Sequence, residues 1–320
     1  MPLPACLEGR LRLPAVVAPM FLTSGPELVI ESCRAGLLGS FPALNQKTAA
    51  GFEAWLSQIE AALDADAAAK SEPRAPFAVN LIVHRSNPRL EEDLAICIAH
   101  EVPVIITSLG AVPEVIARVH GYGGVVFHDV ISRRHVEKAA AAGVDGLVLV
   151  CAGAGGHGGQ LNPFAFIAEA RRLFSGTILL AGGLSRGEDI LAAQIAGADL
   201  AYLGTRFIAT REALAAPAYK AMIVASGSAD IIGTPAISGI FGNFLTESLR
   251  AVGLDPNDLP EAEAMDVATE LLGEHKAWRD IWSAGHGVAA IDDVPGVAEL
   301  TAQLIAAYNA ARSRHLTATG

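Results

Sequence analysis

The sequence predicts an α/β fold, a TIM (β/α)8 barrel with an α-helical lid or insertion near the C-terminus. Short apolar runs alternate with helical stretches between residue 16 and about residue 210. These runs are nearly continuously apolar, which is typical of parallel strands that are covered on both faces. There are eight of them, the number that a TIM barrel requires, and a doubly wound parallel sheet is the alternative.

The predicted strands and helices follow one another in order along the chain. The strands are predicted at residues 16–21, 37–41, 77–83, 102–108, 124–130, 146–152, 177–183 and 200–207. The helix after the first strand has Pro26 near its start and Gly36 at its end, and the helix after the fifth begins at Ser132 and ends at Gly143. After the sixth strand, Asn162 is the expected N-cap of a helix. An amphipathic stretch at residues 297–315 is expected to be the last outer helix of the barrel.

The alternation of strands and helices stops after Phe207. Residues 211 to about 280 contain no strong strand candidate and are rich in Ala, Glu and Pro. We therefore expect a barrel formed by residues 1–210 and 283–320, interrupted by a mainly helical lid at residues 211–282.

Composition and charge exclude several classes of protein. With 52% hydrophobic and 18% charged residues, the chain is expected to fold throughout. The net charge of −11 disfavours nucleic acid and anionic membranes as partners. No apolar run reaches the roughly 20 residues of a membrane helix, and the N-terminus lacks the features of a secretory signal. The four cysteines have no Cys-x-x-Cys spacing, which favours reduced thiols and a cytoplasmic location.

A glycine-rich loop with one histidine follows the sixth predicted strand. Residues 153–158 match the pattern Gly-x-Gly-x-x-Gly, but no helix opens directly from them and no acidic residue ends the next strand. The match to a dinucleotide fingerprint is therefore coincidental. At this end of a barrel strand, His157 is expected to enter the barrel mouth as a donor or base that titrates near neutrality. The alternative is a tight turn whose histidine caps a helix or meets solvent.

Two further glycine loops predict a phosphate site. Gly182 and Gly183 follow the seventh strand, and Gly204 and Thr205 follow the eighth. TIM barrels frequently bind phosphate at these two loops through backbone N–H groups. Together the loops resemble the phosphate site of an FMN enzyme.

Six segments together carry a resemblance to a known family: "VAPMF", "AVNL", "CAGAGGHGG", "LAGGLSRG", "YLGTRFIAT" and "IWSAGHGV". They resemble the nitronate monooxygenase (2-nitropropane dioxygenase) family of FMN enzymes over nearly the whole chain. Flavin-dependent enoyl-ACP reductases and some NADH:quinone reductases share the same loops. The resemblance implies FMN held noncovalently across the mouth of a TIM barrel.

The resemblance also implies roles for particular residues. His157 matches the histidine of the catalytic site, and Ser283 is expected to contact substrate. The residues expected to bind the cofactor are Pro19, Met20, Phe21, Asn80, His128, Gly155, Gly156, Ala181, Gly182, Gly183, Gly204 and Thr205. No metal site is expected.

The sequence departs from the family pattern in two places. His286 occupies a position where glutamine is common, and some relatives have a lysine near the end of the fifth strand, where this chain has His128 and Asp129. We expect His128 to be the cation beside the flavin N1 and O2 atoms, and a packed core histidine is the alternative.

The expected activity is oxidation of alkyl nitronates, and of nitroalkanes, by FMN and O2 to a carbonyl compound and nitrite. The alternative within enzymes is an NAD(P)H-dependent flavin reductase that acts on a quinone or enoyl substrate. A noncatalytic FMN-binding module is the alternative from another class.

Overall fold

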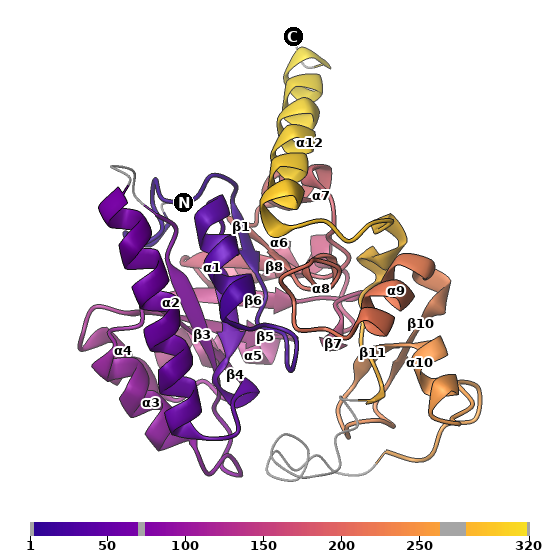
Figure 1. Cartoon of the computed structure of the whole chain (residues 1–320), viewed down its shortest axis with the longest axis horizontal. Coiled ribbons are helices and arrows are strands. Elements are labelled where there is room, and N and C mark those ends of the chain that lie inside the picture. The colour runs from indigo at the N-terminus through magenta and orange to yellow at the C-terminus, as the bar shows by residue number, and fades with distance from the viewer. Residues whose placement is uncertain (1–2, 70–73, 263–279, 319–320) are drawn as a thin grey trace.

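Eight parallel strands form a closed ring in the computed structural model, which describes residues 3–69, 74–262 and 280–318 (Figure 1). The strands are β1 (Ala15–Val17), β2 (Gly39–Pro42), β3 (Phe77–Ile82), β4 (Val104–Ser108), β5 (Val125–Val130), β6 (Gly146–Val150), β8 (Thr177–Ala181) and β9 (Leu200–Leu203). Their order is β1-β9-β8-β6-β5-β4-β3-β2. The two ends of this order meet, because Val16 bridges Leu38 and the Val17 N–H donates to the Leu38 carbonyl at 2.9 Å. The closure confirms the TIM barrel, since the edges of a doubly wound sheet stay apart.

Helices follow the strands and form the outer layer. They are α1 (Pro26–Ala35), α2 (Ala49–Ala69), α3 (Leu90–Ala99), α4 (Pro113–His120), α5 (Arg133–Ala142), α6 (Pro163–Leu173), α7 (Gly187–Ala196), α8 (Thr205–Ile208) and α12 (Val297–Ala318). The predicted end signals are confirmed: Gly36 and Gly143 adopt φ of 87° and 88°, where a side chain would be strained. The Ser132 and Asn162 side chains accept hydrogen bonds from the first turns of α5 and α6.

Alternating residues of each strand face the barrel interior and the helices. On β5, Phe127 packs inside the barrel with Val148 and Leu179, whereas Val126 and Val130 pack in the layer beneath the helices. Because side chains alternate along a strand, Asp129 faces the interior with Phe127, and His128 faces the helix layer.

One predicted strand was too long. Residues 200–207 were expected to be extended, but β9 ends at Leu203 and Thr205–Ile208 forms the short helix α8. Gly204 separates the two with a φ of −103° and a ψ of −72°, which turns the chain out of the sheet. The apolar residues Phe207 and Ile208 are buried in helix α8 rather than in a strand.

The insertion contains strands that the sequence analysis did not expect. Besides helices α9 (Pro217–Ala225) and α10 (Thr246–Ala251), it contains strands β10 (Ile231–Thr234) and β11 (Gly242–Leu245). These strands pair with each other, and β11 also pairs with β7 (Gly156–His157) from the glycine loop. Each new strand has four residues and includes a glycine, so its local pattern is weak and the pairing stabilises it. The domain boundaries remain a proposal.

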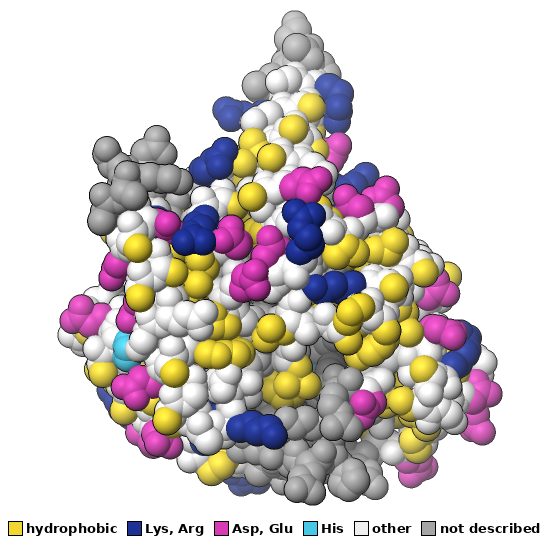
Figure 2. Space-filling view, viewed as in Figure 1, with side chains coloured by type: hydrophobic (Ala, Val, Ile, Leu, Met, Phe, Trp, Pro, Cys, Tyr) yellow, Lys and Arg dark blue, Asp and Glu magenta, His cyan; other side chains and the backbone are white. Residues whose placement is uncertain are grey.

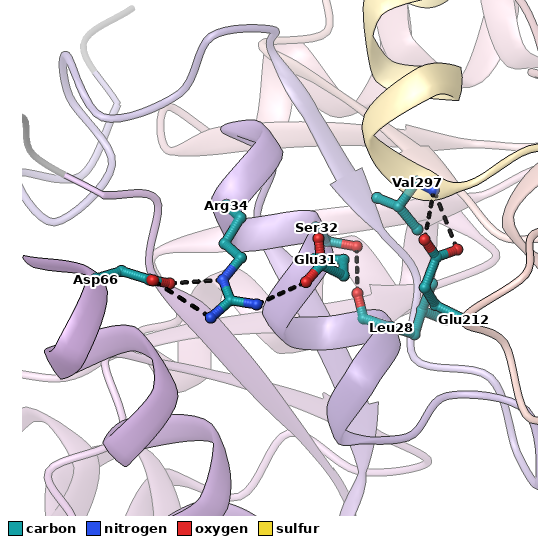
Figure 3. A network of polar contacts seen from close by, with 7 residues as sticks. All are labelled: Leu28, Glu31, Ser32, Arg34, Asp66, Glu212 and Val297. Carbon is teal, nitrogen blue, oxygen red and sulfur yellow. Dashed lines mark hydrogen bonds and ion pairs between the residues drawn. The ribbon is translucent and has the colours of Figure 1, made fainter. Parts of the chain in front are cut away.

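A polar contact joins the start of the insertion to the start of helix α12, where the chain returns to the barrel (Figure 3). Both carboxylate oxygens of Glu212 accept from the Val297 N–H at 3.0 Å, at the first residue of α12. Figure 3 also shows Arg34 of α1, which contacts Asp66 of α2 at 2.6 Å and Glu31 of its own helix at 2.7 Å. Helix α12 packs against α1 and α7, so it completes the outer layer after the insertion, as predicted.

The charged side chains of the surface and the state of the four cysteines can be compared with the expectations from composition. Acidic and basic side chains lie interspersed on the face in Figure 2. Within the described ranges, no helix is long and apolar enough to cross a membrane. Cys33, Cys97 and Cys151 are buried, Cys6 is half-buried, and all four are free thiols.

Candidate active site

The carboxyl ends of the barrel strands open into a cavity of about 820 Å³. This volume lies within the ordinary range for ligand and cofactor sites, roughly 300–1,000 Å³. Every residue that the sequence analysis assigned to the site lines this cavity: Pro19, Met20, Phe21, Asn80, His128, Gly155, Gly156, His157, Ala181, Gly182, Gly183, Gly204, Thr205 and Ser283. The fold therefore brings together segments that lie more than 260 residues apart.

Three polar side chains from the neighbouring strands β3, β4 and β5 form a hydrogen-bonded row on the inner wall of the barrel and line this cavity. Asn80 Nδ2 donates to Ser108 Oγ at 2.8 Å and to the Ile106 carbonyl at 3.0 Å. Ser108 Oγ donates to Asp129 Oδ2 at 2.6 Å. Sequence reasoning assigned Asn80 to the site but did not single out Ser108 or Asp129. The period-two alternation of strand β5 was the signal that could have identified Asp129, because it places that residue on the same face as Phe127.

Asp129 ends the row with one oxygen that has no partner. Its Oδ1 atom is buried and makes no hydrogen bond. Burial raises the pKa of this carboxyl to about 6, and the hydrogen bond from Ser108 opposes the shift. Tyr202 from β9 lines the same cavity, and its pKa is raised by burial and by the nearby charge of Asp129.

His128, the cation that we expected at the end of the fifth strand, lies in a buried environment. Its Nδ1 atom lies 2.8 Å from Thr107 Oγ1, on the helix-facing side of strands β4 and β5. Burial lowers its pKa to about 4, so the imidazole is neutral at pH 7. This burial favours the alternative of a packed histidine, and the role of His128 beside a flavin stays a prediction.

His157 is held in place by the strands of the insertion. It lies on β7 and pairs in register with Gly242 of β11, and its Nε2 atom lies 2.8 Å from Ser238 Oγ. Burial lowers the pKa of His157 to about 4, so it does not titrate near neutrality as we expected. It is instead a neutral imidazole at pH 7, with a fixed position on the cavity wall.

The glycines of the His157 loop allow two backbones to touch. The His286 N–H donates to the Gly153 carbonyl at 2.9 Å, and Gly285 N–H donates to Thr205 Oγ1 at 2.9 Å. A Cβ on Gly155 would lie 2.8 Å from the Gly285 nitrogen. His286, whose family position is usually glutamine in the resemblance, therefore lies behind this loop and is not part of the cavity wall.

We expect Gly155→Ala to destabilise the fold. Its Cβ would also lie 2.9 Å from the Ala284 carbonyl carbon, so two backbone segments would have to move apart. Overpacking of this kind costs about 1–3 kcal/mol, measurable as a lower midpoint of chemical unfolding. Gly227→Ala is the matched control, because its Cβ would meet only Asp230 Oδ2 at 3.8 Å. Equal stability of the two variants would show that the backbones are not in contact.

The loop after β1 is fixed by hydrogen bonds from its neighbours. Asn45 Nδ2 donates to the Met20 and Ser24 carbonyls at 3.0 and 2.7 Å, and the Leu22 N–H donates to Asn45 Oδ1 at 2.9 Å. Leu22 has a φ of 57°, an unfavourable conformation for a leucine. These contacts hold Met20 and Phe21 on the cavity wall.

The two glycines after β8, Gly182 and Gly183, differ in which atoms an added Cβ would contact. A Cβ on Gly182 would lie 2.8 Å from the Ala152 carbonyl oxygen, so this glycine is required by the adjacent backbone. Gly183 has a φ of 72°, and a Cβ there would meet no protein atom within 4 Å. Because Gly183 lines the cavity, the space beside it is open to a ligand.

An aromatic pair from outside the barrel closes part of the wall, and the sequence analysis did not predict it. Tyr219 of α9 stacks on Trp282, with ring centroids 5.0 Å apart and an interplanar angle of 14°. The Tyr219 hydroxyl donates to the Ser283 carbonyl. Tyr219, Trp282 and Ser283 all line the cavity. Tyr219 lies more than 60 residues before the other two in the sequence, so only the fold brings it to them.

Comparison with known proteins agrees with this architecture. The profile of the nitronate monooxygenase family matches residues 11–307. The chain belongs to the nitronate monooxygenase family. It is therefore a flavin-dependent oxidoreductase, and the expectation from its sequence motifs is confirmed at that level.

Individual proteins show similarity over different shares of the chain. A nitronate monooxygenase of Paraburkholderia phytofirmans is 27% identical over 91% of this chain and 91% of its own length. A putative monooxygenase of Mycobacterium tuberculosis is 31% identical over 49% of this chain, which corresponds to 42% of that protein. The crystal structure of nitroalkane oxidase from Streptomyces ansochromogenes superposes with a TM-score of 0.80 at 25% identity, covering 97% of this chain and 99% of that one.

The residues of the cavity fit a flavin. The open space beside Gly183 offers a place for a phosphate, and the Asn80–Ser108–Asp129 row offers polar atoms to the heteroatoms of a ring. The buried Asp129 Oδ1 has no partner within the protein, as expected where a ligand completes the site. No cluster of three potential metal ligands occurs among the residues that the structure describes.

Proposed function

We propose that this protein binds FMN and oxidises alkyl nitronates with O2 to a carbonyl compound and nitrite, and that it also accepts nitroalkanes. The observation that supports this most directly is the neutral imidazole of His157, fixed by Ser238 on the wall of a cavity suited to a flavin. Family membership supports the reaction class. We further propose that the protein works in the cytoplasm and that its partners are small molecules.

We propose that two ends of the cavity bind two parts of FMN. Ala181, Gly182, Gly183, Gly204 and Thr205 would hold the phosphate, because backbone can approach it closely there. Pro19, Met20, Phe21 and Asn80 would line the ring, with Gly155 and Gly156 beside it. When bound, the flavin supplies the electron-accepting ring and the reaction with O2.

His157 is proposed to act on the substrate. A neutral imidazole can accept a proton, so His157 can remove the α-proton of a nitroalkane and can hydrogen-bond to the nitro group or nitronate. Its low pKa keeps the accepting form populated at neutral pH. Ser283, close to Gly156 on the same wall, is the proposed second contact for the substrate.

The first experiment is an anaerobic absorbance spectrum of the FMN-loaded protein. We expect propionate 3-nitronate to bleach the oxidised flavin band, and admission of air to restore it with release of nitrite. Bleaching by NADH or NADPH but not by the nitronate would instead identify a nicotinamide-dependent flavin reductase. Retained FMN that none of the three bleaches would identify a noncatalytic FMN-binding module.

A further inference from the structure

Asp129 is a buried carboxyl that the proposed reaction does not use. It comes from the inward-facing side of β5, and its Oδ2 atom is fixed by the Ser108 hydroxyl at 2.6 Å. Ser108 is fixed in turn by Asn80 at 2.8 Å, so the donors run in one direction along the row toward the carboxyl. The row leaves Asp129 Oδ1, buried and without a partner, on a residue that lines the cavity.

No positive charge compensates Asp129. Within residues 3–69, 74–262 and 280–318, no lysine, arginine or histidine forms an ion pair with it, and burial and the Ser108 hydrogen bond are the causes of its pKa shift. His128, its neighbour on β5, faces the other side of the strand and bonds to Thr107. An ionised carboxyl buried without a cation costs considerable free energy, and a bound proton removes that cost.

The other titratable groups of this cavity are Tyr202 from β9, Tyr219 from α9, His157 from β7, His128 itself, and His135 and Lys138 from α5. Burial lowers the pKa of His128 and of His157 to about 4, and burial with two nearby cations lowers that of His135. Burial raises the pKa of Tyr202 and of Tyr219 above the ordinary value of a tyrosine. Asp129, with a pKa of about 6, is therefore the buried group of this wall that changes charge between pH 5 and 8.

We propose that Asp129 takes up a proton when negative charge develops on the group bound in the cavity. When the bound flavin is reduced, the protein then takes up one proton on Asp129 in addition to any proton that the flavin binds. The two electrons come from the substrate or from an added reductant such as dithionite, and the extra proton passes from solvent to Oδ1 of Asp129. Asn80 and Ser108 are positioning residues that hold the carboxyl in place. The inference rests on the proposed function because it requires a bound flavin.

The test is the pH dependence of the flavin midpoint potential, measured by anaerobic titration of the FMN-loaded protein between pH 5.5 and 8.5. Above about pH 6 Asp129 is ionised before reduction, so the wild-type potential should fall more steeply with pH than that of Asp129→Asn. One proton per two electrons corresponds to about 30 mV per pH unit, which is the expected difference between the two slopes. Below about pH 6 the two slopes should converge, because Asp129 is already protonated.

Two further variants complete the design. Ser108→Ala removes the hydrogen bond that favours the ionised carboxyl, so the pH at which the wild-type slope changes should rise. This variant also keeps the test available if Asp129→Asn fails to fold. Glu114→Gln removes an exposed carboxyl in the first turn of α4 and should keep the wild-type slope.

The outcomes separate this inference from the proposed function. Equal slopes for wild type and Asp129→Asn, with FMN bound to both, overturn the role of Asp129 and leave the proposed function intact. A slope change in Glu114→Gln as large as in Asp129→Asn also overturns it, since any carboxyl would then suffice. A wild-type protein that does not bind FMN overturns both proposals.

Discussion

Replacing His157 with asparagine is expected to lower turnover of a neutral nitroalkane by a factor of about 10²–10⁴, the usual range for loss of a positioned proton acceptor. Asparagine has no nitrogen that accepts a proton at neutral pH, whereas the wild-type imidazole is held unprotonated by its burial. The content of bound FMN should not change, because His157 lies on β7, which pairs with the insertion, and the phosphate is assigned to the loops after β8 and β9. Steady-state nitrite release and the flavin absorbance measure the two quantities.

The same variant should lose much less activity toward a nitronate that is already deprotonated. Such a substrate has no α-proton to remove, so only the hydrogen bond from His157 is lost, about 0.5–1.5 kcal/mol. His100→Asn is the matched control, because His100 bonds to Glu60 between helices α2 and α3 and does not line the cavity. Equal losses for the two substrates would contradict proton transfer to His157 and leave it a binding role.

Replacing Gly183 with alanine is expected to weaken FMN binding about 10- to 100-fold. The new Cβ would meet no protein atom, so it would project into the open space that we assign to the phosphate. Losing one hydrogen bond to a charged group costs about 1.5–3 kcal/mol, which corresponds to that range of affinity. Fluorescence titration of the apoprotein with FMN measures the dissociation constant.

The conformational strain of this substitution needs its own control. Gly123→Ala is that control. Gly123 also has a positive φ, 87°, and its Cβ would also meet no protein atom within 4 Å, but Gly123 is an exposed turn residue outside the cavity. Both variants should lose similar stability, about 1–2 kcal/mol for an alanine in this conformation. The phosphate assignment fails if Gly183→Ala binds FMN as tightly as Gly123→Ala.

The barrel was predictable because its signals are local. Continuous apolar runs, the caps at Ser132 and Asn162, and the glycine ends of helices α1 and α5 depend on neighbours within a few residues along the chain. The strands β10 and β11 were not predictable in the same way. Each is short and contains a glycine, and its stability comes from pairing with a partner strand.

The sequence by itself determined the βα repeat, the family, and the set of segments that meet at the carboxyl ends of the strands. Only the tertiary structure decided the surroundings of two neighbours on strand β5: Asp129 bonds to Ser108 on the inner wall, and His128, which also reaches the cavity, bonds to Thr107. It also decided that His157 is neutral and held by strand β11 and Ser238. The physical reason is that repeats and caps follow from covalent neighbours, whereas charge state and orientation follow from desolvation and from contacts between residues far apart in the chain.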